Sequence, residues 1–246
     1  ALDNARTETV SAHMMRIFDR HGLPEVIRSD NGSPFAACNS PLGLSRLSAW
    51  WLSLGINLDR IPPGRPDQNG GHERMHRDLA WEVESHADLD RETQQASLDV
   101  WRRTFNEERP HEALGMRVPR DVYHASPRKF DPTPVELVYP RGYLVRKVNC
   151  IGSVKIHKAA VNVSAALRGF VIGLEPLAEN RYATWFCRLC LGHIDVSTHR
   201  FHAITGRSTD AKNNHQGSEK FFPPGIPGGK DHESNPTMKP NPNLSP

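Results

Sequence analysis

The feature that most constrains the fold of this chain is a change of hydrophobic pattern after a proline-rich stretch at residues 127–134. Before that stretch, apolar residues repeat at helical spacing in several long segments, and short segments of strand type lie between them. After it, the apolar segments are short, rich in β-branched and aromatic residues, and bounded by glycine or polar turns. The sequence therefore predicts an α/β layer domain followed by a small all-β domain.

In the first part, helices are predicted at residues 7–20, 42–54, 67–85 and 90–108, and strands at residues 25–28 and 56–61. Asp67 and Asp90 each precede a helical pattern and are its expected N-cap. Two strands are too few for a packed sheet of this kind. The remaining strands are therefore expected to lie before residue 1.

In the second part, short strands separated by turn residues indicate a small antiparallel barrel or sandwich. They are predicted at residues 144–148, 153–156, 160–163, 171–174 and 182–189. We therefore divide the chain into a partial α/β domain at residues 1–126, a linker at 127–134, a small basic β domain at 135–204 and a tail at 205–246. The tail holds 7 Pro, 5 Gly and 5 Asn in 42 residues, so it is expected to be disordered.

Charge is distributed unevenly between these parts. Residues 135–204 hold 9 Lys and Arg against 4 Asp and Glu, a net charge of +5, whereas residues 1–134 carry −3. A cationic β segment is a candidate surface for a polyanion such as nucleic acid. No apolar run approaches the roughly 20 residues of a membrane helix, and no signal-peptide pattern opens the chain. We therefore expect no contact with a membrane and no secretion.

Asp30 is the first candidate for chemistry, because it directly follows the predicted strand at residues 25–28. Functional sites of α/β sheets collect where strands end. Asn31 and Gly32 then form a tight turn that leaves the carboxylate exposed. The alternative is an Asx-turn, in which the Asp30 side chain binds only its own backbone.

Glu73 is the second candidate, in the first turns of the helix predicted at residues 67–85. Asn69, Glu73 and Arg77 are spaced by four and share one helix face. Gly70 and Gly71 lower helix stability, which favours a site where something approaches the backbone closely. The alternative is that Glu73 only interacts with the helix dipole near the N-terminus.

A third pattern, Cys187-x-x-Cys190-x-x-His193 with His199 beyond it, is similar to a zinc site. If residues 182–189 form one strand, however, the two cysteines point to opposite faces. Chelation then requires a turn at Arg188 and Leu189, which neither residue favours. Zinc is therefore not expected.

Three ordered blocks of residues resemble the integrase-type DDE transposases, which are bacterial insertion-sequence recombinases with a core similar to retroviral integrase. The blocks are Ser29-Asp30-Asn31-Gly32 with Phe35; Gln68-Asn69-Gly70 with Glu73, Arg74 and Arg77; and Asn106 with Arg109-Pro110-His111 and Ala113-Leu114-Gly115. The resemblance covers residues 1 to about 125 and implies a ribonuclease-H-like fold, a mixed sheet with helices. The basic β segment is similar to the small C-terminal domain of some of these transposases.

The resemblance implies three carboxylates that bind two Mg²⁺ or Mn²⁺ ions and transfer DNA strands. Asp30 matches the second carboxylate and Glu73 the third, while Arg77 and Asn69 are expected to contact DNA. Further DNA contacts are expected from the basic β segment, at Lys147, Lys155, Lys158 and Arg168. It also implies double-stranded DNA as partner, a homo-oligomer and a bacterial cytoplasmic location.

The family's first Asp lies on the first sheet strand, which the chain as printed does not contain. We therefore expect an N-terminally truncated transposase that is inactive alone. The expected function is divalent-metal-dependent DNA strand transfer in transposition or integration. Two alternatives stay open, a non-catalytic nucleic-acid-binding protein and a metal-dependent nuclease of the same fold.

Overall fold

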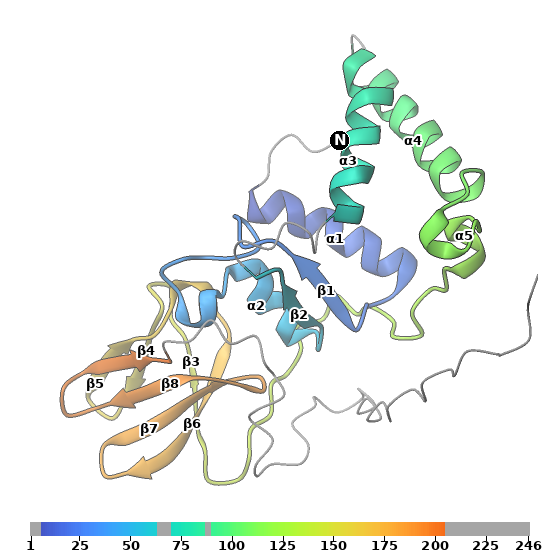
Figure 1. Cartoon of the computed structure of the whole chain (residues 1–246). Coiled ribbons are helices and arrows are strands. Elements are labelled where there is room, and N and C mark those ends of the chain that lie inside the picture. Colours follow the sequence, from blue (N-terminus) through green and yellow to red (C-terminus); the bar gives the residue numbers. More distant parts are fainter. Residues whose placement is uncertain (1–5, 63–69, 87–89, 205–246) are drawn as a thin grey trace, which may run out of the picture.

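The computed structural model describes residues 6–62, 70–86 and 90–204, and its helices and strands are labelled in Figure 1. The helices are α1 (Thr7–His21), α2 (Arg46–Ser53), α3 (Gly70–Glu82), α4 (Arg91–Glu107) and α5 (Pro119–Val122), with short 3₁₀ turns η1 (Pro41–Gly43), η3 (Glu84–His86), η4 (Glu112–Leu114) and η5 (Ala165–Leu167). The strands are β1 (Val26–Ser29), β2 (Asn57–Arg60), β3 (Leu144–Lys147), β4 (Ser153–Ile156), β5 (Ala159–Asn162), β6 (Val171–Ala178), β7 (Arg181–Phe186), β8 (Leu189–Asp195) and β9 (Arg200–Ala203). The predicted disorder of the tail and the roles of Asp67 and Asn69 fall on residues outside this description.

The first part of the chain forms the predicted α/β layer. Strands β1 and β2 pair in parallel, with Val26 opposite Asn57 and Ser29 opposite Arg60. Helices α1 and α2 pack beside them, and the buried side chains that join these elements are Phe18, Leu47, Trp51, Leu54 and Ile56. Because the strands are parallel, their carboxyl ends meet at one edge of the sheet.

Helix α2 begins later than predicted. A helix was expected over residues 42–54, but residues 41–43 form a separate 3₁₀ turn in which Leu42 and Gly43 have positive φ angles of 52° and 64°. The helix starts after Ser45, whose hydroxyl accepts a hydrogen bond from the Ser48 backbone nitrogen, while the Ser48 hydroxyl accepts one from the Ser45 nitrogen. This reciprocal pair is a capping box, which fixes the start of α2.

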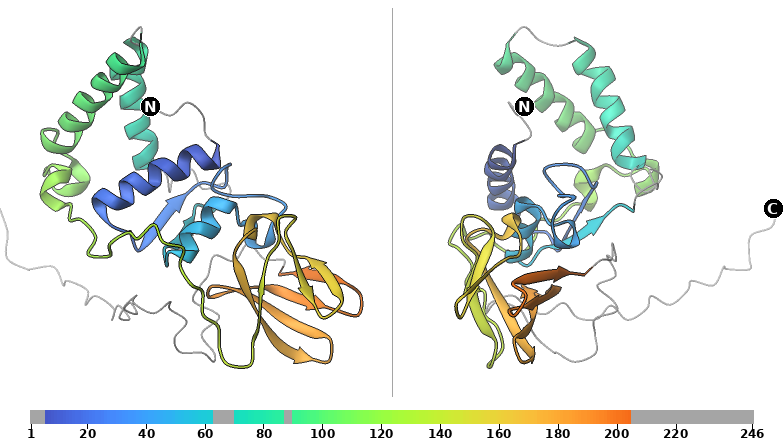
Figure 2. Two further views of the ribbon diagram at one scale, coloured as in Figure 1. Left: turned by 180° about the vertical axis from the view of Figure 1, so that it is seen from behind. Right: turned by 90° about the vertical axis from the view of Figure 1, so that its left-hand side faces the viewer.

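Helices α3 and α4 form a hairpin that stands away from the sheet (Figure 2). Neither helix contains a buried residue. The N-cap predicted at Asp90 is confirmed, because its Oδ1 accepts a hydrogen bond of 2.9 Å from the Thr93 backbone nitrogen. The side chains of Trp101 and Phe105 stack on α4, with ring centroids 4.9 Å apart.

The second part forms an antiparallel sheet of order β3-β6-β7-β8-β9 and a separate β4–β5 hairpin. The hairpin contacts β3 through β4 and β9 through β5, so the β elements close on themselves as in the predicted small barrel. The single strand predicted at residues 182–189 is wrong. Phe186 pairs with Leu189 across a two-residue turn in which Cys187 has a φ of 51°, so β7 ends there and β8 begins.

The two parts share buried apolar surface through α2. Leu47 and Trp51 face the α/β cluster, whereas Ala49 and Leu52 belong to the cluster of the β part, together with residues such as Val154. Helix α2 is therefore covered on two sides by apolar side chains from different parts of the chain.

The stretch predicted as a linker, residues 127–134, is packed rather than free. The Arg128 guanidinium donates hydrogen bonds to the backbone oxygens of Pro24 (2.9 Å) and Leu54 (2.8 Å), and Phe130 packs against the α/β cluster. The division into domains at this stretch stays a prediction. Within the described residues, no helix combines the length and the apolar character needed to cross a bilayer.

Candidate functional site

Asp30 lies in the turn that directly follows β1. Its Oδ1 accepts a hydrogen bond of 2.9 Å from the Gly32 backbone nitrogen, so the Asx-turn considered as the alternative is present. The neighbouring Asn31 side chain donates to the Ile61 backbone oxygen at 2.7 Å, which ties this turn to the end of β2. Among the described residues, Oδ2 of Asp30 has no partner, and the side chain is exposed. The turn therefore orients the carboxylate and leaves one oxygen accessible, so the turn and a ligand role are compatible.

Glu73 lies in the first turn of α3, which follows the carboxyl end of β2 along the chain. Figure 1 shows that α3 runs away from the β1–β2 sheet. The Glu73 side chain is exposed and has no hydrogen-bond or ion-pair partner among the described residues. Asp30 and Glu73 therefore both belong to the segments that follow the carboxyl ends of the parallel strands.

Arg77 lies one turn beyond Glu73 on α3, and its exposed guanidinium is also without a partner in the described part of the chain. Residues four apart on a helix are neighbours on its surface. A free guanidinium beside a carboxylate is suited to hold a phosphate oxygen of a substrate.

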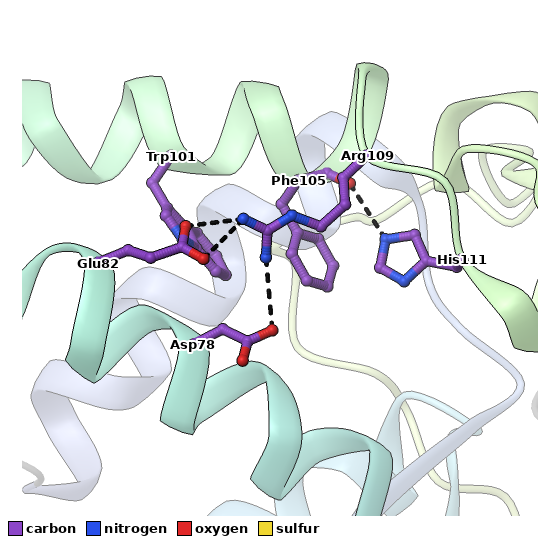
Figure 3. A network of polar contacts seen from close by, with 6 residues as sticks. All are labelled: Asp78, Glu82, Trp101, Phe105, Arg109 and His111. Atoms are coloured by element: carbon purple, nitrogen blue, oxygen red, sulfur yellow. Dashed lines mark hydrogen bonds and ion pairs between the residues drawn. The ribbon is translucent and has the colours of Figure 1, made fainter.

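Other carboxylates of α3 are committed to an ion-pair network, shown in Figure 3. The Arg109 Nη2 donates to both carboxylate oxygens of Glu82, at 2.7 and 2.8 Å, and its Nη1 approaches Asp78 at 3.4 Å. The indole nitrogen of Trp101 donates to Glu82 at 2.8 Å. These contacts join α3 to the segment after α4, so they position the helix that carries Glu73. Arg109, which belongs to one of the three sequence blocks, thus has a structural role here.

The predicted cationic contacts of the β part fall into two groups. Lys147 and Arg168 line one open hollow of about 590 Å³. Arg46, at the start of α2, completes this hollow, and its Nη1 donates a hydrogen bond of 2.7 Å to the Arg168 backbone oxygen. Lys155 and Lys158 are exposed on the β4–β5 hairpin and its turn and do not line the hollow.

Sequence reasoning missed Arg46, because 122 residues separate it from Arg168 and no local pattern links them. Among the residues that the structure describes, no carboxylate lines the hollow. Three basic side chains around an uncompensated concavity make it a candidate anion site.

Comparison with known proteins adds an independent observation. Residues 54–119 match the model of the integrase core domain family. The matched segment begins just before β2, contains Glu73, Arg77 and Arg109, and ends at the start of α5. Residues 54–119 are thus similar to an integrase core. The predicted resemblance and the α/β class of ribonuclease-H-like type are therefore confirmed, whereas Asp30 lies outside the matched segment.

The chain is similar to the Pol polyprotein of Feline endogenous virus ECE1, to which it is 33% identical over 139 residues, 54% of this chain and 11% of the polyprotein. The Insertion element IS407 uncharacterized 31.7 kDa protein of Burkholderia multivorans is 28% identical over 114 residues, 44% of this chain and 39% of that protein. The chain thus spans less than half the length of these relatives.

Among solved structures, the simian T-cell lymphotropic virus intasome in complex with PP2A regulatory subunit B56 gamma overlaps 78% of this chain and 63% of its own matched chain. The identity is 16% and the TM-score 0.39, an overlap too loose to indicate a shared topology.

Asp30 and Glu73 fit a hard divalent cation in part. Mg²⁺ prefers carboxylate oxygen, and both Asp30 and Glu73 offer an accessible oxygen. The described residues contain no group of three or more His, Cys, Asp or Glu side chains arranged to hold a metal ion. The donor chemistry of the pair therefore fits Mg²⁺ or Mn²⁺, but two described carboxylates are fewer than the three that the resemblance implies.

The Cys187, Cys190 and His193 pattern has a different setting from the one predicted. The argument against zinc assumed that no turn separates the cysteines, but the chain does turn at Cys187 and Arg188. Packing against the apolar β cluster raises the pKa of the Cys187 thiol to about 12, which opposes the thiolate that a metal requires. The Cys190 thiol instead contacts the Gly192 backbone oxygen at 3.8 Å.

Proposed function

We propose that this chain functions in DNA integration or transposition, as part of a divalent-metal-dependent DNA strand transferase. The observation that carries the proposal is the integrase core match over residues 54–119, which includes Glu73 and Arg77. Support comes from the parallel β1–β2 pair, whose carboxyl ends lead into the segments that carry Asp30 and Glu73.

In this proposal, Asp30 and Glu73 hold Mg²⁺ or Mn²⁺ through their accessible oxygens. When bound, such ions lower the barrier for in-line displacement at phosphorus by stabilising charge on the attacking and leaving oxygens. The Asx-turn at Asp30 keeps its carboxylate in one orientation, and Arg77 binds a phosphate oxygen of double-stranded DNA. Asn69 adds a DNA contact one turn before Glu73 if the helical spacing extends to it.

A second candidate function is non-catalytic nucleic-acid binding. The hollow lined by Arg46, Lys147 and Arg168 favours it, because no carboxylate of the described part of the chain lines it. In either function we propose that the chain assembles as a homo-oligomer on DNA.

The test of catalysis is a strand-transfer assay with labelled oligonucleotide duplexes in Mg²⁺ and in Mn²⁺. It compares this chain with a longer version that begins with the Asp-bearing strands implied by the resemblance. We expect joined products from the longer version only, lost in Asp30→Asn and in Glu73→Gln. The control is Glu84→Gln, an exposed carboxylate after α3 that should leave joining unchanged.

Three outcomes separate the candidates. Joined products abolished by Glu73→Gln support strand transfer. Cleaved but unjoined products indicate the nuclease of the same fold. Binding of duplex DNA by both versions without any chemistry overturns the transferase in favour of the non-catalytic function.

The test of DNA binding is the salt dependence of duplex affinity, measured by fluorescence anisotropy on the full chain. Each phosphate contact contributes about −0.9 to the slope of log K against log salt. We expect the slope to weaken by about one contact in Lys147→Ala and in Arg168→Ala. The Lys155→Ala and Lys158→Ala variants show whether the β4–β5 hairpin contributes as well. Affinity that does not respond to salt would contradict phosphate recognition by this face.

A further inference from the structure

Two histidines on α3 lie close together and are not used by the proposed function. His72 and His76 are spaced by four on the helix, and both side chains are exposed. Their Nε2 atoms are 3.2 Å apart, and the ring centroids are 4.3 Å apart with the planes at 82°. The two Nε2 atoms therefore face each other on the exposed surface of the helix.

This separation matches chelation of a single ion. With metal–nitrogen bonds of about 2.0–2.1 Å, two imidazole nitrogens on one ion lie about 2.9–3.4 Å apart for bond angles between about 90° and 109°. The observed 3.2 Å falls inside that range without movement of the helix. A bound ion replaces the hydrogen bond in which one Nε2–H donates to the other Nε2 lone pair.

We propose that His72 and His76 form a bidentate site for one borderline transition-metal ion of the Cu²⁺, Ni²⁺ or Zn²⁺ class. Imidazole nitrogen suits these ions, whereas carboxylate oxygen suits Mg²⁺ and Mn²⁺, so this site is chemically distinct from Asp30 and Glu73. The described residues add no third side chain, so the remaining coordination positions stay open to water or an external ligand.

The site would act on α3 itself. An ion that bridges residues four apart links two successive turns of the helix. Because α3 contains no buried residue, apolar packing contributes little to its stability, and metal binding adds directly to it. The charges nearby are mixed: Glu73 adjoins His72 and favours a bound cation, whereas Arg74 and Arg77 oppose it. Because only two side chains bind the ion and two arginines lie nearby, we expect a lower affinity than at sites with three or four protein ligands.

The chain contains a matched pair that lacks this geometry. His193 on β8 lies opposite His202 on β9, with ring centroids 4.8 Å apart. Their planes are nearly parallel, at 15°, so the rings stack face to face instead of pointing nitrogen to nitrogen. This second pair therefore serves as a control for two histidines that are close together but do not point their nitrogens at each other.

The experiment titrates the full chain with Cu²⁺–iminodiacetate, a capped ion that leaves few positions for protein ligands. Electron paramagnetic resonance reports nitrogen coordination, and hydrogen exchange reports protection of residues 70–82. We expect one capped ion per chain, slower exchange in α3, and at least a tenfold loss of affinity in His72→Ala and in His76→Ala. His193→Ala should change the affinity by less than twofold.

Glu73→Gln separates this inference from the proposed function, because it removes a candidate Mg²⁺ ligand but leaves both imidazoles. Retained Cu²⁺ binding in Glu73→Gln supports a separate site, whatever the strand-transfer assay shows. Binding that is unchanged in both His72→Ala and His76→Ala, or that disappears in Glu73→Gln, overturns the proposal.

Discussion

Helix α2 and the α3–α4 hairpin are held in opposite ways. Six of the eight residues of α2 are buried, and they contact apolar clusters on two sides. The hairpin has no buried residue within either helix and is joined instead by the Arg109 network with Asp78 and Glu82. Apolar burial is the dominant source of stability, whereas partly exposed ion pairs contribute little. The elements that carry Asp30 and Glu73 are therefore stabilised to different degrees.

The two candidate carboxylates, Asp30 and Glu73, therefore differ in how firmly the fold holds them. Asp30 is fixed by a turn bonded to Ile61, directly after β2, and β2 packs against α2. Glu73 is carried by the weakly buried hairpin. We expect α3 to open locally more often than the β1–β2 edge, and the following predictions test this difference from the largest effect to the smallest.

The largest effect is expected from Leu52→Ala, because Leu52 is 5% exposed and belongs to the apolar cluster that includes Val154 and Leu174. Removing a buried leucine costs about 2–5 kcal/mol of unfolding free energy. Since α2 joins the two parts, urea denaturation should shift the tryptophan fluorescence and circular dichroism transitions together. Two transitions that separate in Leu52→Ala would show that the parts unfold independently.

The next effect concerns alkaline pH. Burial raises the pKa of Cys187 from 9.0 to about 12, so the unfolded chain releases this proton first. The thiol contribution to stability is complete below pH 9 and is lost as pH rises toward 12, by up to about 1.4 kcal/mol per pH unit. The unfolding free energy of the native chain should therefore fall more steeply between pH 9 and 10.5 than that of Cys187→Ala. Equal slopes would contradict burial of the thiol, and Cys150→Ala, at an exposed position, is the control.

Ser45→Ala tests the start of α2. It removes one half of the capping box and should cost about 1 kcal/mol of unfolding free energy. Urea denaturation measures the loss, and Ser45→Asn should recover much of it because Asn is also a strong N-cap residue. A loss in Ser45→Ala that Ser45→Asn does not reduce would place the role of Ser45 elsewhere, for example in its bond to the Phe35 oxygen.

The smallest global effect is expected from Glu82→Gln, which removes the charge facing Arg109 but keeps an acceptor for Trp101. Both partners are about one-third exposed, so the thermal midpoint should shift by little. Hydrogen exchange of residues 70–107 should nevertheless accelerate several-fold, because the network joins the two helices. Glu84→Gln is the control, and a large fall in midpoint would show that the hairpin and the main core unfold as one unit.

Local signals predicted the helices best. The residues of α1 and the Asp90 cap of α4 are fixed by contacts within a few residues, and both predictions are confirmed. The start of α2 was misplaced because Leu42 adopts a positive φ that its residue type does not indicate. The β7–β8 turn was missed for a similar reason, since Cys187 is not a typical turn residue.

The sequence predicted only those parts of the candidate site whose residues lie within one short segment of the chain. The blocks around Asp30 and Glu73 are local, and so is the Asx-turn that the sequence offered as an alternative. The hollow that Arg46 shares with Arg168 depends on the packing of α2 against η5. Such a contact between distant parts of the chain has no local sequence signal.

The burial of α2 on two sides has a consequence for the spacing between the cationic hollow and the Asp30 turn. The first residue of α2, Arg46, lines the cationic hollow. After its last residue, Ser53, three residues lead into β2, and Ile61, directly after β2, is bonded to the Asp30 turn. If the proposed function holds, α2 fixes the distance between these two places on the protein. We therefore expect DNA contacts made at the hollow and at the Asp30 turn to keep a constant spacing, because both places are attached to one buried helix and not to a free linker.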